Sequence, residues 1–141
     1  MIESTEDAHP GSITGAMRSV SRFVPPLLLM GLIFFLSAQP DLSSGLGTWD
    51  LILRKLAHMA EYGLLWFLWW RALGYGNPAI PAAIAIGYSI SDELHQTTVE
   101  GRHGTPVDVL IDSTGVALAY LAARARERRA RRARRSDSVA P

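Results

Sequence analysis

The chain has 141 residues, enough for one domain, with 48% hydrophobic and 19% charged residues and a formal net charge of +1 at pH 7. It contains no cysteine, which excludes a disulfide, a thiolate metal site and a cysteine nucleophile. The apolar residues are gathered in four blocks between polar ends. This pattern predicts an all-α integral membrane bundle of four transmembrane helices.

The N-terminal part, residues 1–20, mixes acidic residues, serine, threonine, proline and glycine with few apolar side chains. Such a composition cannot bury a core, so we expect a disordered leader. The first apolar block, residues 23–38, has two prolines near its start, where missing backbone N–H groups cost a helix least. Arg18 and Arg22 precede it and small residues end it, so a cleaved signal peptide is an alternative to a retained helix.

The second block, residues 51–73, can supply the roughly 20 helical residues that a hydrocarbon core of about 30 Å requires. The aromatic residues that would form an interfacial belt near its end are Trp66, Trp69, Trp70 and Tyr75. The third block, residues 79–96, ends in a polar run, and the fourth, residues 107–123, carries two aspartates in its first turns. Blocks one, three and four are short for membrane spans, so a soluble helical bundle is the alternative. The length of the second block argues against it.

Basic residues are concentrated near the C-terminus, where residues 124–135 contain eight of the fourteen lysines and arginines. Positive charge is retained on the cytoplasmic side of membranes, so we expect a membrane domain over residues 21–123, a basic cytoplasmic tail over residues 124–141 and a cytoplasmic N-terminus. Such a tail can also contact anionic lipid, whereas nucleic acid is a poor partner for a membrane-anchored segment. This topology brings the charged ends of blocks two, three and four to the outer leaflet.

Three predicted helices carry polar faces at this depth. At 100° per residue, the members of these faces are Lys55, His58, Glu61 and Tyr62 in block two, Asp92, His95 and Gln96 in block three, and Asp108, Asp112, Gly115 and Ala119 in block four. Ionised groups inside a bilayer are costly unless paired or hydrated, so they normally face the bundle interior and mark function. Five carboxylates against Lys55 and Arg102 leave a negative pocket, which needs protons, a cation or a cationic partner.

We therefore predict an outward-facing pocket that binds a polar lipid head group or a cell-wall precursor. Its predicted binding residues are Lys55, His58, Glu61, Tyr62, Asp92, Glu93, His95, Gln96, Arg102 and Asp108. Lys55 and Arg102 would contact phosphate. In the alternative interpretation these two cations pair with Asp108 or Glu61 only to fix helix packing, and the histidines are hydrogen-bonded packing residues.

A rival hypothesis from another class is a metal-dependent membrane hydrolase or transferase that acts on a lipid-linked substrate. The candidate ligands of its divalent cation are His58, His95, Glu61, Asp92 and Asp108. Arg102 would stabilise charge in the transition state, and the sequence assigns no catalytic residue. A small proton or cation transporter is a third hypothesis, but the charged residues are confined to one leaflet.

Taken together, these residues resemble the VanZ-like family of bacterial membrane proteins. The family pattern is present here as Ser37-Ala38-Gln39-Pro40, as Lys55-x-x-His58-x-x-Glu61-Tyr62, and as Ser91-Asp92-Glu93-Leu94-His95-Gln96 followed by Gly101-Arg102, Asp108 and Gly115. The resemblance covers residues 23–123. Two positions depart from the pattern, because Arg54 stands where aspartate is usual and Asp112 stands where asparagine is usual.

The resemblance implies a fold of membrane helices and a multi-pass location in the bacterial cytoplasmic (inner) membrane. The namesake of the family is linked to antibiotic resistance, namely resistance to the glycopeptide teicoplanin. Extending that phenotype to this chain rests on analogy alone, because one fold can host many functions.

Overall fold

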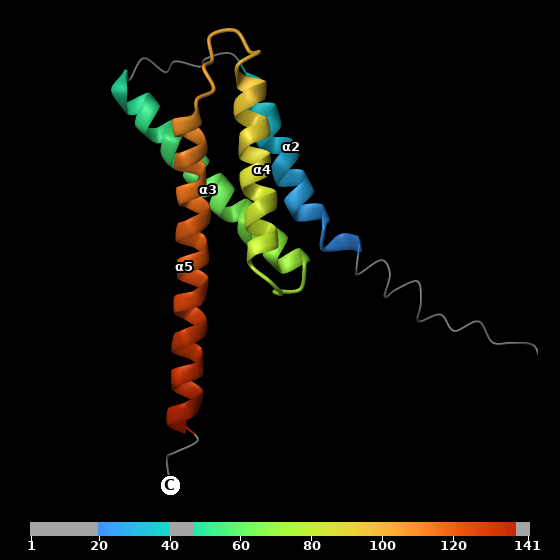
Figure 1. The fold of residues 1–141 in the computed structure, drawn as a ribbon, viewed down its shortest axis with the longest axis vertical. Helices are drawn as coiled ribbons and strands as arrows, with labels where there is room; N and C mark the ends of the chain where they lie inside the picture. Colours follow the sequence, from blue (N-terminus) through green and yellow to red (C-terminus); the bar gives the residue numbers. More distant parts are fainter. Residues whose placement is uncertain (1–19, 40–46, 138–141) are drawn as a thin grey trace, which may run out of the picture.

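The computed structural model describes residues 20–39 and 47–137, and all regular secondary structure in these ranges is helical (Figure 1). Its helices are α2 (Val24–Ser37), α3 (Thr48–Ala72), α4 (Ala79–Gln96) and α5 (Pro106–Asp137). The predicted all-α class is therefore confirmed, and the helices begin and end within a few residues of the predicted blocks except at the end of α5. Residues 1–19 of the predicted leader lie outside the described residues, as does Pro40 of the first motif.

The last helix is longer than its apolar block, because it continues through the arginine-rich segment to Asp137. Alanine and arginine are strong helix formers, and residues 124–135 contain little else. Arg134 and Arg135 lie in the last turn, where positive charge interacts favourably with the helix dipole. Most of the predicted basic tail is thus a helical continuation of α5.

Local sequence signals explain how the chain turns between α3 and α4. Gly74 and Tyr75 both have positive φ angles, of 75° and 58°, and the Tyr75 ring packs edge-on against Trp70. Asn77 Oδ1 then accepts a hydrogen bond of 3.0 Å from the N–H of Ala79. This bond satisfies one of the backbone N–H groups that the start of a helix leaves without an intrahelical partner.

The packing of the bundle centres on the crossing of α3 and α5, while α2 packs against α3 and α4 (Figure 1). A Cβ on Gly115 would lie 2.0 Å from the Met59 carbonyl oxygen, and one on Gly63 would lie 2.9 Å from the Gly115 carbonyl oxygen and 3.5 Å from Ala119 Cβ. Small residues allow two helix backbones to approach this closely. The predicted stripe of small residues on α5 is therefore part of its contact surface with α3.

The buried core fills the space around α3. Its members are Ile33, Tyr62, Leu65, Trp66, Trp70, Ala85 and Val116. Two tryptophans of the predicted interfacial belt belong to this core, since Trp66 is fully buried and Trp70 is 9% exposed. Their indole N–H groups donate to the carbonyls of Pro78 and Gly76 at 3.2 and 3.1 Å. The predicted interfacial position is wrong for these two residues, because their rings fill the core while the loop after α3 satisfies their polar edges.

Among the described residues, one helical segment is long and apolar enough to cross a membrane by length and composition, and it lies within Pro106–Arg135. The apolar helix α2 has 14 residues, which at 1.5 Å each span about 21 Å of a hydrocarbon core of about 30 Å. Charged and polar residues lower the hydropathy of α3 and α4. Four transmembrane spans with cytoplasmic termini therefore stay a prediction.

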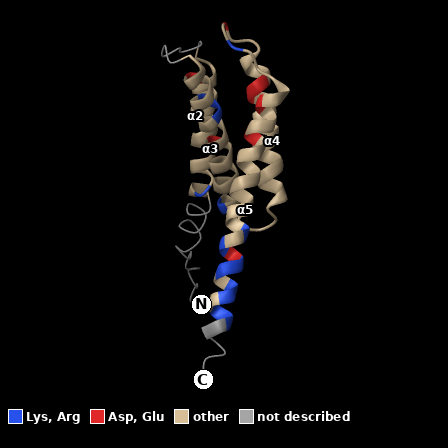
Figure 2. Ribbon diagram, turned by 90° about the vertical axis from the view of Figure 1, so that its left-hand side faces the viewer, with Lys and Arg blue, Asp and Glu red and all other residues tan. Residues whose placement is uncertain are grey.

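Charge is separated along the molecule (Figure 2). Lysine and arginine gather over the C-terminal part of α5, whereas the acidic residues of α4 lie toward the opposite end. At that opposite end lie the last turns of α2 and α4 and the first turns of α3 and α5 (Figure 1). We call this half of the bundle, with the loop that joins α4 to α5, the polar end.

Candidate functional site

A cleft of about 210 Å³ opens at the polar end. The first half of α3, the last turns of α4, the following loop and the start of α5 bound it. The residues that line it are Leu51, Arg54, Lys55, His58, Glu93, Gln96, Gly101, Arg102, His103, Asp108, Ile111 and Asp112. Six of the ten predicted binding residues are among them, so sequence positions up to 53 residues apart meet around one space.

An ion pair between Lys55 and Asp108 ties α3 to α5 at one side of the cleft. The Thr105 hydroxyl donates a hydrogen bond of 2.7 Å to Asp108 Oδ2. The same hydroxyl oxygen accepts a hydrogen bond of 3.3 Å from the backbone N–H of Asp108. Through the second of these bonds Thr105 acts as an N-cap, because its hydroxyl oxygen satisfies one of the backbone N–H groups in the first turn of α5. The ion pair is partly open to solvent, with side chains 35% and 23% exposed. The pairing of Lys55 with Asp108 is the contact that the packing interpretation expected, and the partial exposure of Lys55 keeps its ammonium group accessible from the cleft.

Asp92 lies between α2 and α4 and is 1% exposed. It accepts hydrogen bonds from the Ser37 hydroxyl and from Gln96 Nε2, the latter at 3.1 Å. Gln96 follows Asp92 by about one helical turn, so both side chains project from the same face of α4. The Tyr62 hydroxyl lies near this carboxylate without forming a hydrogen bond of good geometry. The first and third sequence motifs thus meet at one buried carboxylate.

Glu93 is also buried, with 5% exposure, and it faces the loop after α4. Its Oε2 accepts a hydrogen bond of 3.0 Å from the backbone N–H of Thr105. The loop approaches α4 so closely that a Cβ on Gly104 would lie 1.9 Å from the Glu93 carbonyl oxygen. Glycine at this position therefore allows the loop to close over the end of α4.

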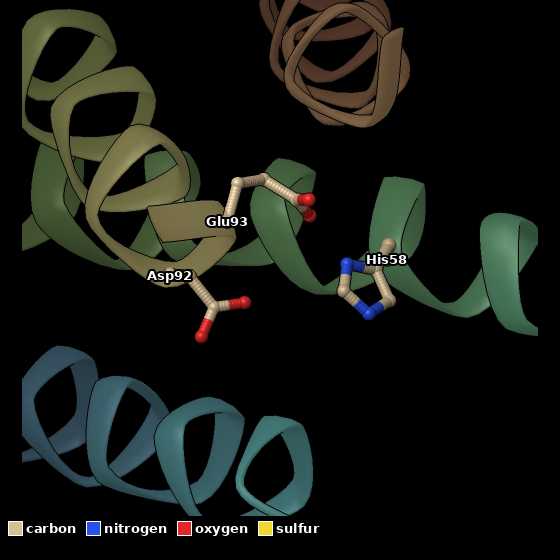
Figure 3. A group of neighbouring side chains, drawn as sticks. All are labelled: His58, Asp92 and Glu93. Carbon is tan, nitrogen blue, oxygen red and sulfur yellow. The ribbon is translucent and has the colours of Figure 1, made fainter. Parts of the chain in front are cut away.

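Asp112 of α5 lies beside His58 and is 1% exposed. One of its oxygens accepts a hydrogen bond of 2.6 Å from the Ser89 hydroxyl, and the other lies 3.5 Å from His58 Nδ1. The side chains of His58, Asp92 and Glu93 point toward a common space between α3 and α4 (Figure 3). One potential ligand atom from each of these three residues lies within 4.8 Å of the other two.

Arg102 lines the cleft and also reaches α2. Its guanidinium donates from Nε to the Gln39 carbonyl at 2.9 Å and from a terminal nitrogen to the Leu36 carbonyl at 3.1 Å. The last carbonyls of a helix have no intrahelical donor, and a basic side chain near the helix end can bond to them. Arg102 therefore joins the loop after α4 to the C-terminal end of α2.

The other predicted site residues lie outside the lining of the cleft. His95 stacks on Phe34 with ring centroids 4.3 Å apart, and its Nε2 is buried without a hydrogen-bond partner among the described residues. Glu61 is half-buried on α3. Of the five metal candidates, His58 and Asp92 belong to the close group of three, and Glu93 is its third member in place of His95, Glu61 or Asp108.

Several residues of the site were missing from the predicted binding set. They are Asp112, Ser89, Ser37, Thr105 and His103. Asp112 was visible on the polar stripe of the fourth block, and its position next to His58 depends on the rotation of α5 against α3. Ser89 precedes Asp92 by three residues, which puts both on one helix face. Hydroxyl donors of this kind give no composition signal, because serine and threonine occur throughout the chain.

The cleft arranges its charges by depth. Among the residues that line it, Lys55 has a side-chain exposure of 35%, whereas Glu93 and Asp112 are at most 5% exposed. Asp92 lies next to them, outside the lining, and is 1% exposed. Cationic side chains are thus nearer to solvent, and a group of carboxylates with one imidazole lies beneath them. This arrangement can accept an anionic group from outside and a cation within.

Comparison with known sequences gives one family. The sequence model of the VanZ/LLP1 family matches residues 13–127, a range that includes every residue of the cleft. Searches of the curated proteins and of the solved structures give no match.

Proposed function

The chain belongs to the VanZ/LLP1 family, and we propose that it is a multi-pass protein of the bacterial cytoplasmic membrane. Its cleft faces outward and binds the phosphate-bearing head group of an envelope lipid or of a lipid-linked cell-wall precursor. The observation that carries this proposal is the cleft itself, where Lys55 from α3 and Arg102 from the loop after α4 line one opening.

The outer surface of the bundle supports a lipid environment. On α2 and α5, the large apolar side chains that are more than half exposed are Leu27, Leu28, Leu32, Phe35, Val107, Leu110, Leu118 and Leu121. Exposed apolar surface of this kind marks an interface with lipid or with another protein. Because the two helices lie on different sides of the bundle (Figure 1), a surrounding bilayer covers both faces at once.

The separation of charge supports the orientation. Arg71 lies in the last turn of α3, and the arginines of α5 gather away from the polar end (Figure 2). A strong excess of positive charge at one end of a short bundle places that end in the cytoplasm. The cleft then opens at the outer leaflet, where precursors and head groups of the envelope are accessible.

A phosphate group suits the more exposed side of the cleft. Guanidinium binds phosphate through paired N–H donors, and the ammonium group of lysine adds a compact charge. The carbonyls of Leu36 and Gln39 hold the Arg102 guanidinium in place before any ligand arrives. Such pre-organisation reduces the entropy that binding would otherwise cost.

Thermal unfolding of the full-length protein in detergent tests the proposal. Polyprenyl pyrophosphate and phosphatidylglycerol should raise the unfolding temperature more than phosphatidylcholine does, and a ligand at 100 times its Kd stabilises a protein by about 2.7 kcal/mol. Arg102→Ala should abolish this difference. So should Lys55→Gln combined with Asp108→Asn, which removes the cation without leaving its carboxylate unpaired.

Arg71→Gln is the matched control, because Arg71 lies at the opposite end of α3 and is exposed. The arginines of α5 remain in every variant, so their attraction to anionic lipid contributes equally throughout. The proposal is rejected if the cleft variants respond to the phosphate lipids as strongly as the wild type and Arg71→Gln do.

A further inference from the structure

We propose that His58, Asp92 and Glu93 hold a divalent transition-metal cation at the base of the cleft, beneath the cationic residues. The site combines one imidazole from α3 with two carboxylates from consecutive positions of α4. The existence of this cation site is independent of lipid binding. Its role as a bridge to the bound phosphate, argued below, rests on the proposed function.

The geometry of the three residues supports a shared cation. A potential ligand atom from each lies within 4.8 Å of the others, close enough for a small cation to contact all three after modest side-chain movement. The residues come from two different helices, and their side chains converge on one space instead of spreading along a surface (Figure 3). Asp92 and Glu93 are buried, so the cluster is not a set of solvated surface acids.

Two buried polar atoms beside the group provide a second, independent observation. Asp112 Oδ1 accepts no hydrogen bond of good geometry within the described residues, although its residue is 1% exposed, and the group that it faces is His58, whose Nδ1 lies 3.5 Å away as an ion-pair partner when the imidazole is protonated. The Tyr62 hydroxyl is completely buried near Asp92 and also has no hydrogen-bond partner there. Buried polar atoms in native proteins are normally satisfied, and an exception calls for an explanation such as an ion.

The donor atoms indicate the class of metal. Carboxylate oxygens alone would suit Mg²⁺ or Ca²⁺, but an imidazole nitrogen favours a transition metal such as Zn²⁺ or Mn²⁺. Ser37 and Gln96 hold the Asp92 carboxylate, and Thr105 holds that of Glu93. Hydrogen bonds of this kind orient metal-binding carboxylates. Asp112 would act on the metal through His58, as a positioning residue.

A bound cation also explains how an acidic cleft accepts a phosphate. Three buried carboxylates would repel an anionic head group, and a divalent cation among them reverses the sign of the local field. The phosphate would then lie between this cation and the outer pair of Lys55 and Arg102. Phosphate binding at the cleft should therefore weaken when the metal is removed.

Metal titration of the full-length protein in detergent tests the site. After chelator treatment and removal of any affinity tag, Zn²⁺ and Mn²⁺ are titrated separately by calorimetry, and retained metal is measured by mass spectrometry. The wild type should bind about one equivalent of Zn²⁺ or Mn²⁺. Glu93→Gln and His58→Ala should each weaken binding at least about tenfold, and Asp112→Asn should weaken it by about 10- to 100-fold.

Glu100→Gln serves as the matched control. It removes an exposed carboxylate from the loop after α4, so it should bind metal like the wild type. A wild type that retains neither metal overturns the site, as do equal affinities in Glu93→Gln and Glu100→Gln. Metal binding without an effect of chelation on the phosphatidylglycerol response keeps the cation site and rejects the bridge. A lipid response that survives in Arg102→Ala rejects the proposed function instead.

Discussion

Replacing Gly115 by alanine should disrupt the α3–α5 crossing on which the cleft depends. The added Cβ would lie 2.0 Å from the carbonyl oxygen and 2.7 Å from the carbonyl carbon of Met59. Both atoms belong to the backbone, so no side-chain rotation can relieve the overlap. To reach an ordinary contact of 3.4 Å, the helices must separate locally by about 1.4 Å.

Overpacking of a well-packed contact costs typically 1–3 kcal/mol, and a backbone collision lies toward the upper end, so we expect a loss of about 2–3 kcal/mol in unfolding free energy. Gly87→Ala in α4 is the matched control, because nothing lies within 4 Å of the Cβ that it would add. That substitution should stabilise the protein by about 0.5–1 kcal/mol, since glycine in a helix interior is less favourable than alanine. The changes in unfolding free energy expected for Gly115→Ala and Gly87→Ala thus differ in sign as well as in size.

Unfolding of both variants can be followed in detergent by circular dichroism at increasing temperature and denaturant concentration. Because Met59 follows His58 and Gly115 lies one turn after Asp112, a wider crossing should also move His58 away from Asp112 and weaken metal binding. A Gly115→Ala protein as stable as the wild type would show that α3 and α5 do not pack through this glycine, and the reasoning would fail.

Two further predictions concern the ion pair and the topology. In a double-mutant cycle, Lys55→Met and Asp108→Asn should couple by about 1 kcal/mol, because the pair is partly exposed and therefore partly screened; additive effects on unfolding would contradict it. The chain has no native cysteine, so Glu100→Cys should react with a membrane-impermeant maleimide on intact cells. Gly76→Cys should react only after permeabilisation. If Gly76→Cys reacts on intact cells and Glu100→Cys does not, the cleft opens toward the cytoplasm and the proposed orientation is wrong.

The helices and one of their contact surfaces could be predicted because the relevant signals are local. Apolar blocks, prolines in the first turn of α2 and the spacing of Gly115 and Ala119 need no knowledge of neighbouring helices. The extension of α5 through the arginine segment was not predicted, although alanine and arginine are strong helix formers. Helical propensity and charge act together there, since a basic helix end is electrostatically favourable.

The pairings inside the polar end could not be predicted, because they depend on how the helices rotate against one another. Trp66 shows this for the core, since an indole near the end of an apolar block can face lipid or the bundle interior with the same sequence pattern. Arg102 shows it for the site. Arg102 follows Gln39 by 63 positions and Leu36 by 66 positions. Its bonds to these two carbonyls therefore depend on the path of the loop after α4.

The buried carboxylates accept their hydrogen bonds from neutral donors, which orient them without supplying positive charge. The hydrogen bonds that Asp92, Glu93 and Asp112 accept within the described residues come from Ser37, Gln96, Thr105 and Ser89. If packing were their only role, neutral or apolar side chains of similar volume would serve at least as well, because burying charge is costly. The presence of three acids around His58 therefore favours a bound cation. A cation that binds only the folded state adds its binding free energy to the stability of the bundle. The cleft and the fold are then coupled, so removing the cation should lower the unfolding temperature even when no lipid ligand is present.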